Sequence, residues 1–240
     1  MAIAMLLPPG VALAQDGLQL GVRAQQESKI YRQQDRELNF YPYVRWQIGR
    51  FSVDGDRASY ELFRAADGGW KFGPEVRVEF DGYEAKDSPA LSGMASRSDP
   101  VLVGVSGEAE IGWLELEGFA GYDVRDGGGT ILELELGVDG RIATGLFGYA
   151  GVGARYANSK YNNHLFGVRA GEATPTRPAY SPGSSTTAFV EFGIEYELSP
   201  RWSLQAELEY SRLSQSIRRS PIVDASSRTE AQFGVLYRFY

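Results

Sequence analysis

Pairs of carboxylates two residues apart are the first feature of this sequence that could do chemistry. Three pairs stand out: Glu115/Glu117, Glu133/Glu135 and Glu207/Glu209. Residues i and i+2 of a strand point to the same face, and retaining glycosidases hold two carboxyl groups about 5–5.5 Å apart. With Arg141 and Arg155 interleaved among such acids, the pattern also fits a solvated, salt-bridged surface. We favour the surface, because perturbed carboxylates belong to structural networks more often than to active sites.

The single histidine, His164, is the other candidate for catalysis. A lipase or protease needs a histidine that activates a serine or a water molecule. The phospholipase pattern has a serine two residues after its histidine, and here that position is Phe166. We therefore interpret His164 as a loop residue and predict a non-enzymatic protein. With no cysteine and one histidine, the sequence gives no reason to expect a metal or another cofactor.

Basic residues cluster near the C-terminus at Arg212, Arg218 and Arg219. Guanidinium forks suit phosphate oxygens, so these residues are candidates for contact with lipopolysaccharide; the alternative is an ordinary solvated loop. The net charge of −7 argues against a nucleic-acid partner, since binding to a phosphate backbone requires a basic face.

The elements that carry these residues are indicated by an alternation of period two that runs from Leu18 almost to the end of the chain. One segment, for example, alternates Leu132, Leu134, Leu136 and Val138 with Glu133, Glu135, Gly137 and Asp139. Several segments are longer than the roughly 5–6 residues of a globular strand and match the ~9–11 of a tilted transmembrane strand. The alternation therefore predicts an all-β protein with membrane-spanning strands.

The breaks between segments are short and long in turn, as in an up-and-down barrel with tight turns at one rim and extended loops at the other. Short breaks fall at 48–50, 65–69, 112–113, 144–145 and 199–201, and long polar breaks at 27–37, 84–100, 158–186 and 214–227. A weak hairpin over 51–64, turning at Asp54-Gly55-Asp56, brings the count to about twelve strands. Ten strands is the alternative.

Alternation alone does not decide which face points inward, because a soluble barrel shows the same pattern. A barrel of about twelve strands has a wide interior, which suits a polar lining. Aromatic residues such as Trp46, Trp113 and Trp202 lie near the ends of segments, where an interfacial girdle belongs. We therefore predict an apolar lipid face and a lumen that holds a charge network of Glu115, Glu117, Glu133, Glu135, Arg141, Arg155, Glu207 and Glu209.

The N-terminus is apolar and ends in Ala12-Leu13-Ala14, the small-x-small pattern that signal peptidase accepts. Residues 1–14 are predicted to be a signal peptide and residues 15–240 a single barrel domain. No Lys or Arg precedes Arg23, as expected if translation starts further upstream.

Short motifs in the last third resemble the MipA/OmpV family of Gram-negative outer-membrane proteins, the MltA-interacting proteins. They are Arg201-Trp202-Ser203-Leu204, Ser220-Pro221-Ile222-Val223 and Tyr237-Arg238-Phe239, with Leu165-Phe166-Gly167-Val168 and Pro178-Ala179-Tyr180 in the longest break. The resemblance implies a barrel in the cell outer membrane that scaffolds periplasmic murein-processing enzymes, a hydrolase and a synthase. It implies no residue-level site. The alternative function is a narrow pore for small solutes.

The closing segment is predicted to be the lipid face of the last strand, at Phe233, Val235, Tyr237 and Phe239. By resemblance to outer-membrane proteins in general, the same four residues are the address read by the barrel-assembly machinery.

Overall fold

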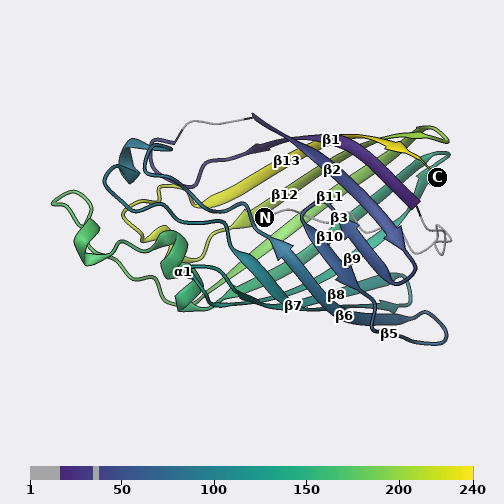
Figure 1. Ribbon diagram of the computed structural model, residues 1–240, viewed down its shortest axis with the longest axis horizontal. Helices are drawn as coiled ribbons and strands as arrows, with labels where there is room; N and C mark the ends of the chain where they lie inside the picture. The colour runs from purple at the N-terminus through teal and green to yellow at the C-terminus, as the bar shows by residue number, and fades with distance from the viewer. Residues whose placement is uncertain (1–16, 35–37, 240) are drawn as a thin grey trace.

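The computed structural model describes residues 17–34 and 38–239, and almost all of its regular structure is β (Figure 1). The strands are β1 (Gly17–Glu27), β2 (Leu38–Ile48), β3 (Phe51–Asp54), β4 (Arg57–Tyr60), β5 (Phe63–Arg64), β6 (Trp70–Val78), β7 (Val101–Ile111), β8 (Leu114–Asp123), β9 (Thr130–Ala143), β10 (Leu146–Ala157), β11 (Ser185–Ser199), β12 (Trp202–Arg212) and β13 (Ser227–Arg238). Two short helices, α1 (Ser159–Phe166) and α2 (Gln215–Arg218), lie in the loops. Within the described residues, no helix is long and apolar enough to cross a membrane. The predicted signal peptide, residues 1–14, lies outside the described residues.

The strands form one closed antiparallel barrel. Successive strands pair with each other except for β4 and β5, and β1 pairs with β13 to close the ring, with Gln19 opposite Arg238. Because β4 and β5 both pair with β6, they are two pieces of one interrupted strand, and the barrel has twelve strands. The predicted up-and-down topology is confirmed, and the ten-strand alternative is wrong.

The weak hairpin is a real but short part of the wall. β3 and β4 have four residues each and are joined through Gly55, whose φ of +58° lies in the left-handed region that favours glycine. Above the hairpin tip, the Tyr41 ring on β2 stacks on Phe80 after β6, with centroids 5.9 Å apart. This aromatic contact joins the two sides of the wall where the hairpin is too short to reach.

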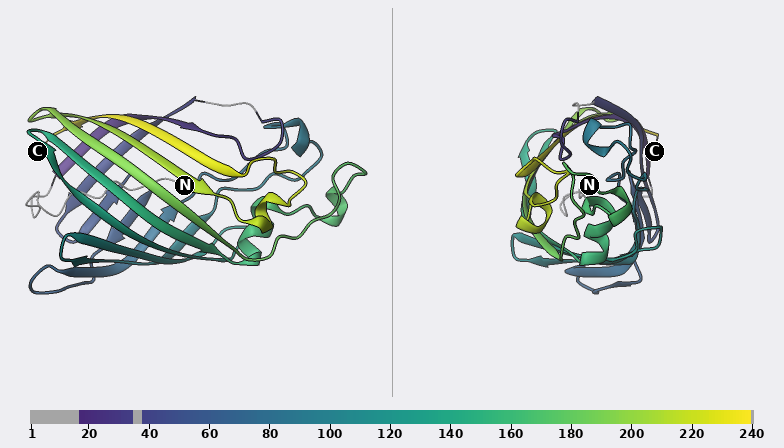
Figure 2. Two further views of the ribbon diagram at one scale, coloured as in Figure 1. Left: turned by 180° about the vertical axis from the view of Figure 1, so that it is seen from behind. Right: turned by 90° about the vertical axis from the view of Figure 1, so that its left-hand side faces the viewer.

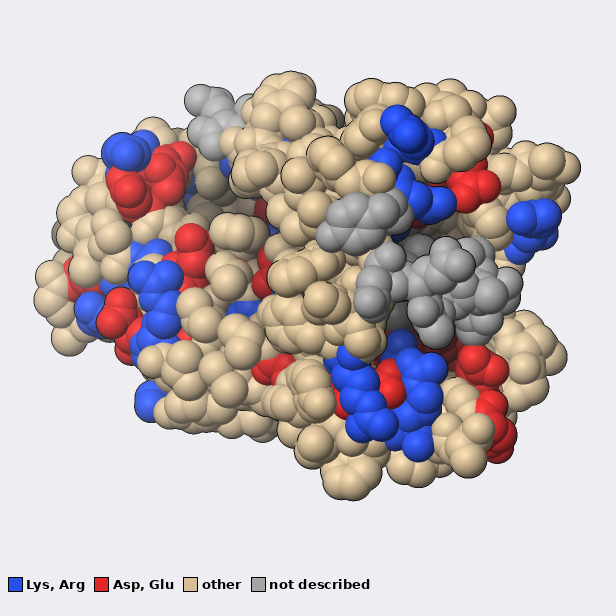
Figure 3. Space-filling model, turned by 45° about the vertical axis from the view of Figure 1, so that its right-hand side comes forward, with Lys and Arg blue, Asp and Glu red and all other residues tan. Residues whose placement is uncertain are grey.

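The two faces of the barrel wall differ as predicted. On β9, Leu132 and Leu134 are exposed, whereas on β12 Glu207 and Glu209 are buried in the lumen. In Figure 3, blue and red atoms gather toward either end of the face shown, with broad tan areas between them. A wall that exposes leucine and buries glutamate suits a membrane, since lipid then covers the apolar side chains.

The long loops pack into a cap at the end of the barrel opposite the C-terminus (Figures 1 and 2). Its buried apolar core includes Tyr31, Tyr83, Leu91, Leu165, Ile222 and Val223. The end-on view shows α1 and the neighbouring loops lying across the mouth of the barrel. Sequence reasoning treated these segments as polar loops and missed the cap; apolar pairs such as Ile222-Val223 were its only signal.

Candidate functional site

Buried arginine–carboxylate pairs in the lumen join strands that are not adjacent in the barrel. Arg77 of β6 donates to Glu133 of β9 at 2.9 Å, and Arg155 of β10 donates to Glu79 at 2.6 Å. All three of Arg77, Arg155 and Glu79 are buried. Each guanidinium carries five donors in a fixed fork, so one arginine can serve acceptors on several walls.

A second group of pairs occupies the other half of the wall. Arg23 of β1 contacts Glu207 of β12 at 3.3 Å, and Arg45 of β2 contacts Glu195 of β11 at 3.1 Å. The Arg23 guanidinium also lies 3.9 Å from the centre of the Tyr43 ring. These bonds join strands that lie two to four places apart in the ring, and they put paired charges inside the lumen.

The predicted carboxylate pairs are only partly satisfied. Glu133 and Glu207 have arginine partners, yet every one of the six carboxylates keeps one buried carboxyl oxygen without a hydrogen-bond partner among the described residues. Glu117 and Glu135 lie directly opposite each other on β8 and β9. Like charges opposed in this way destabilise a sheet. No group of three or more His, Asp or Glu in the described part of the chain is arranged to hold a metal ion.

Arg141 lies apart from the predicted network. It is exposed near the short-turn end of β9, with its guanidinium 5.2 Å from the centre of the Phe147 ring. The alternation predicts the face on which Arg141 lies but not the residues that it meets. Because Arg141 lies near the end of β9, it does not join the network that the sequence predicts for it.

The cap contains the buried ion pair Arg97–Glu172, which sequence reasoning did not single out. Arg97 Nη2 donates to both carboxyl oxygens of Glu172, at 3.0 and 2.8 Å, and the Ala95 and Arg169 amides donate to the same carboxylate. Burial by itself raises the pKa of this carboxyl, but these hydrogen bonds and the Arg97 charge outweigh it and lower the pKa to about 2. Arg177 joins the same two loops by donating to the Ala90 and Ser92 carbonyls.

The three candidate lipopolysaccharide contacts are all exposed on the cap side. Arg212 ends β12, two residues beyond Tyr210 on the same outward face, and Arg218 is the last residue of α2 and precedes Arg219. No side-chain partner is found for them in the described residues, and their binding of lipopolysaccharide stays a prediction.

The closing strand lies as the sequence predicts. Phe233 and Phe239 are exposed on the outer wall, Val235 and Tyr237 are half-buried on the same face, and Tyr237 packs edge-on against Trp202 of β12 at 5.0 Å. Recognition of this strand by the barrel-assembly machinery stays a prediction.

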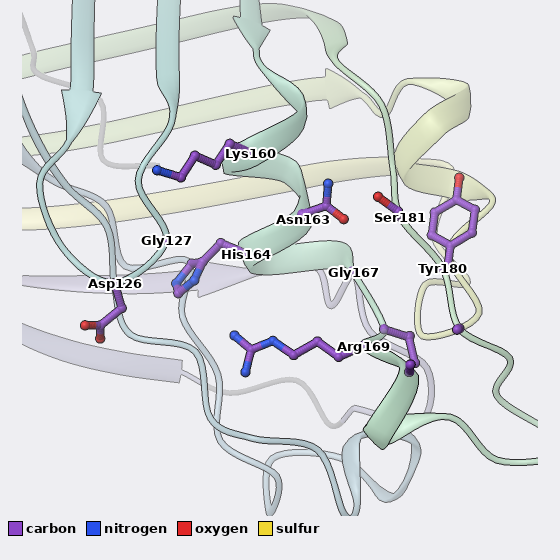
Figure 4. A pocket seen from close by; sticks show the side chains of 12 residues that line it. Asp126, Gly127, Lys160, Asn163, His164, Gly167, Arg169, Tyr180 and Ser181 are labelled. Atoms are coloured by element: carbon purple, nitrogen blue, oxygen red, sulfur yellow. The ribbon is translucent and has the colours of Figure 1, made fainter.

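His164 makes a structural hydrogen bond in the cap. Its ring is buried on α1, and Nε2 donates to the Ser98 carbonyl at 2.8 Å. In Figure 4, Ser181 lies on the far side of the helix from this ring. A serine activated by His164 would have to lie within hydrogen-bond reach of it.

A closed twelve-strand barrel with an apolar outer wall and a charged lumen is a protein of the outer-membrane β-barrel class. Residues 20–239 match the family described as MltA-interacting protein MipA, so the chain belongs to this family. Its place is the cell outer membrane, and the family resemblance is confirmed.

Two relatives and one solved structure resemble the chain. Outer membrane protein OmpV of Vibrio cholerae is 27% identical over 164 residues, which cover 65% of this chain and 61% of OmpV. MltA-interacting protein of Escherichia coli is 29% identical over 90 residues, covering 37% of this chain and 36% of that protein. The chain thus matches less than two-thirds of the length of either relative. The translocator domain of the autotransporter NalP from Neisseria meningitidis superimposes with a TM-score of 0.51 at 13% identity, covering 96% of this chain and 91% of that domain; this similarity concerns the fold alone.

Proposed function

We propose that this protein is a non-enzymatic, non-conducting scaffold whose short periplasmic turns contact murein-processing enzymes. The observation that supports it is a lumen crossed by buried ion pairs beneath a packed cap. A barrel whose interior serves as a bonded support acts through its surfaces. The name of the Escherichia coli relative, MltA-interacting protein, supports a protein partner.

The contact surface would be assembled from several turns, because each one is short. Trp113, in the turn between β7 and β8, is 78% exposed. Tryptophan is enriched among the residues that carry most of the energy of protein interfaces. The interrupted strand adds Leu62 and Phe63, both exposed, at the same end of the barrel.

Co-purification from native membranes, with conductance measured on the same sample in a planar bilayer, tests both functions. The scaffold requires a murein hydrolase or synthase in the purified sample and no channel activity. Replacing Trp113 by Ala should reduce retention of the partner. Replacing Trp202, a girdle residue at the same end, controls for loss of membrane anchoring. Solute-sized conductance steps without a retained enzyme would instead establish the narrow pore.

A further inference from the structure

A pocket on the outer side of the cap belongs to no function described so far. It has a volume of about 550 Å³ and lies between α1, the loop after β8 and the segment 167–181. Lys160, Asn163 and His164 of α1, with Gly167 at its C-terminal cap, line the pocket. Figure 4 shows Lys160 and His164 on the side of Gly127 and Asn163 on the side of Ser181. Pockets of about 300–1,000 Å³ are typical of small-ligand sites.

The opposite wall is built by two segments that bond to each other. Val168 and Tyr180 form an antiparallel bridge, with N–H···O distances of 2.8 and 3.0 Å in the two directions. These segments contain the two motifs singled out in the longest loop. The floor depends on Gly127, where an added Cβ would lie 2.4 Å from the His164 ring. The pocket is therefore framed by fixed backbone and not by mobile side chains alone.

Two cationic side chains line the pocket and have hydrogen-bond donors that no described acceptor uses. Lys160 donates to the Tyr122 hydroxyl at 3.2 Å, a neutral acceptor, which leaves two ammonium hydrogens free. Arg169 is exposed, no acceptor for its guanidinium is found within the described residues, and Figure 4 shows it pointing back beneath His164. Asp126 is the acid among the lining residues. The Asn163 amide group already donates to the Ser159 and Pro182 carbonyls. The pocket thus combines two phosphate-binding cations with a carboxylate suited to hydroxyl or amino groups.

The level of the pocket relative to the membrane indicates where its ligand comes from. Tyr122 is an exposed aromatic residue at the cap end of β8, where a barrel carries its outer girdle, so Lys160 lies at the level of the lipid headgroups. Directly below, β9 exposes Leu132 and Leu134, on which acyl chains can pack. We propose that this pocket binds the phosphorylated saccharide headgroup of an outer-leaflet glycolipid, with Lys160 and Arg169 contacting phosphate and Asp126 contacting the sugar.

The test measures binding of lipopolysaccharide to the full chain in nanodiscs of zwitterionic lipid. Lys160→Met, which keeps the apolar stem, and Arg169→Ala should each weaken binding about tenfold or more, as expected for one lost charge-assisted hydrogen bond. The double variant should approach the affinity of wild type for dephosphorylated lipopolysaccharide. Lys86→Met is the matched control, because Lys86 is an exposed lysine of another cap loop, and it should leave binding unchanged.

Three results would overturn the proposal. The first is unchanged binding by the double variant in a sample that shows wild-type folding by heat-modifiable gel mobility. The second is equal binding of the dephosphorylated glycolipid. The third is a loss of binding in an Arg218→Ala/Arg219→Ala variant alone, which would place the headgroup at α2. Glucose 6-phosphate is the soluble probe: weak binding by it supports a lipid-borne ligand, and binding as tight as that of lipopolysaccharide would refute one.

Discussion

Removing the Glu172 carboxylate should open the cap without unfolding the barrel. The carboxylate accepts two bonds from Arg97 and one each from the Ala95 and Arg169 amides. In Glu172→Ala the Arg97 side chain, 1% exposed, would be left as an unpaired buried charge. Breaking a buried pair in this way costs about 3–5 kcal/mol. The lowering of the Glu172 pKa from its ordinary value near 4.5 to about 2 independently corresponds to about 3 kcal/mol.

The assay is hydrogen exchange of the Val168 and Tyr180 amides, which bond to each other's carbonyls in the loop that carries Glu172. A cost of about 3 kcal/mol raises their exchange rate roughly a hundredfold when exchange follows local opening. The control is Glu84→Ala, which breaks the exposed Glu84–Lys86 pair in the facing loop and should cost under about 1 kcal/mol. Equal exchange in the two variants would refute the assignment of cap stability to the buried pair.

The same pair makes the cap sensitive to acid. Because the folded-state pKa of Glu172 is depressed, its contribution is complete above about pH 4.5, where the carboxyl is ionised in both open and closed caps. The contribution is lost as the pH falls from about 4.5 to about 2. The protection of the wild-type Val168 amide, measured as the intrinsic exchange rate divided by the observed rate at each pH, should therefore fall over this range. Glu172→Gln, which cannot ionise, should lack that part of the pH dependence.

Three further predictions concern the loop glycines, the last strand and the lumen. Gly129→Ala should destabilise the contact between the β8–β9 loop and α1 by more than about 1 kcal/mol, because φ is +115° and a Cβ would lie 2.5 Å from the Tyr161 amide nitrogen. The control is Gly171→Ala, where a Cβ meets nothing within 4 Å, and it should be close to neutral in the same hydrogen-exchange measurement. Deleting Phe239–Tyr240 removes the Phe239 N–H bond to Leu18 and should lower the amount of heat-modifiable barrel in the outer membrane while export continues, and normal assembly would contradict this. Arg155→Ala leaves a fully buried carboxylate unpaired and should cost about 3–5 kcal/mol in urea unfolding, whereas Lys71→Ala, at a more exposed pair, should cost under about 1 kcal/mol.

Much of the barrel could be predicted from local pattern. Strand alternation put Leu132 and Leu134 on one face and Glu207 on the other, because successive side chains of a strand point to opposite faces. The width of the barrel and the aromatic girdle then assigned the apolar face to lipid. The left-handed turn at Gly55 and the alternation of short and long breaks gave twelve strands without any knowledge of contacts. These properties depend on neighbours in the chain, so the sequence carries them directly.

The partners of the charged residues could not be predicted in this way. Nothing in the spacing of Arg77 and Glu133, which lie 56 residues apart, says that they meet, and nothing local separates them from Arg141, which lies apart on Phe147. The cap was missed for the same reason. Leu165 and Ile222 look like isolated apolar residues in polar loops, and only closure of the barrel brings those loops together.

The sequence by itself determined the class of this protein: a strand repeat long enough to cross a membrane, with lipid and lumen faces already assigned by side-chain polarity. The tertiary structure decided which charges pair across the lumen, which loops bury a core, and where Lys160 and Arg169 border one pocket. The physical reason is the separation along the sequence of the residues that decide each property. Backbone geometry translates local sequence into faces and turns, whereas pairs, core and pocket arise from residues that become neighbours only after β1 and β13 close the ring.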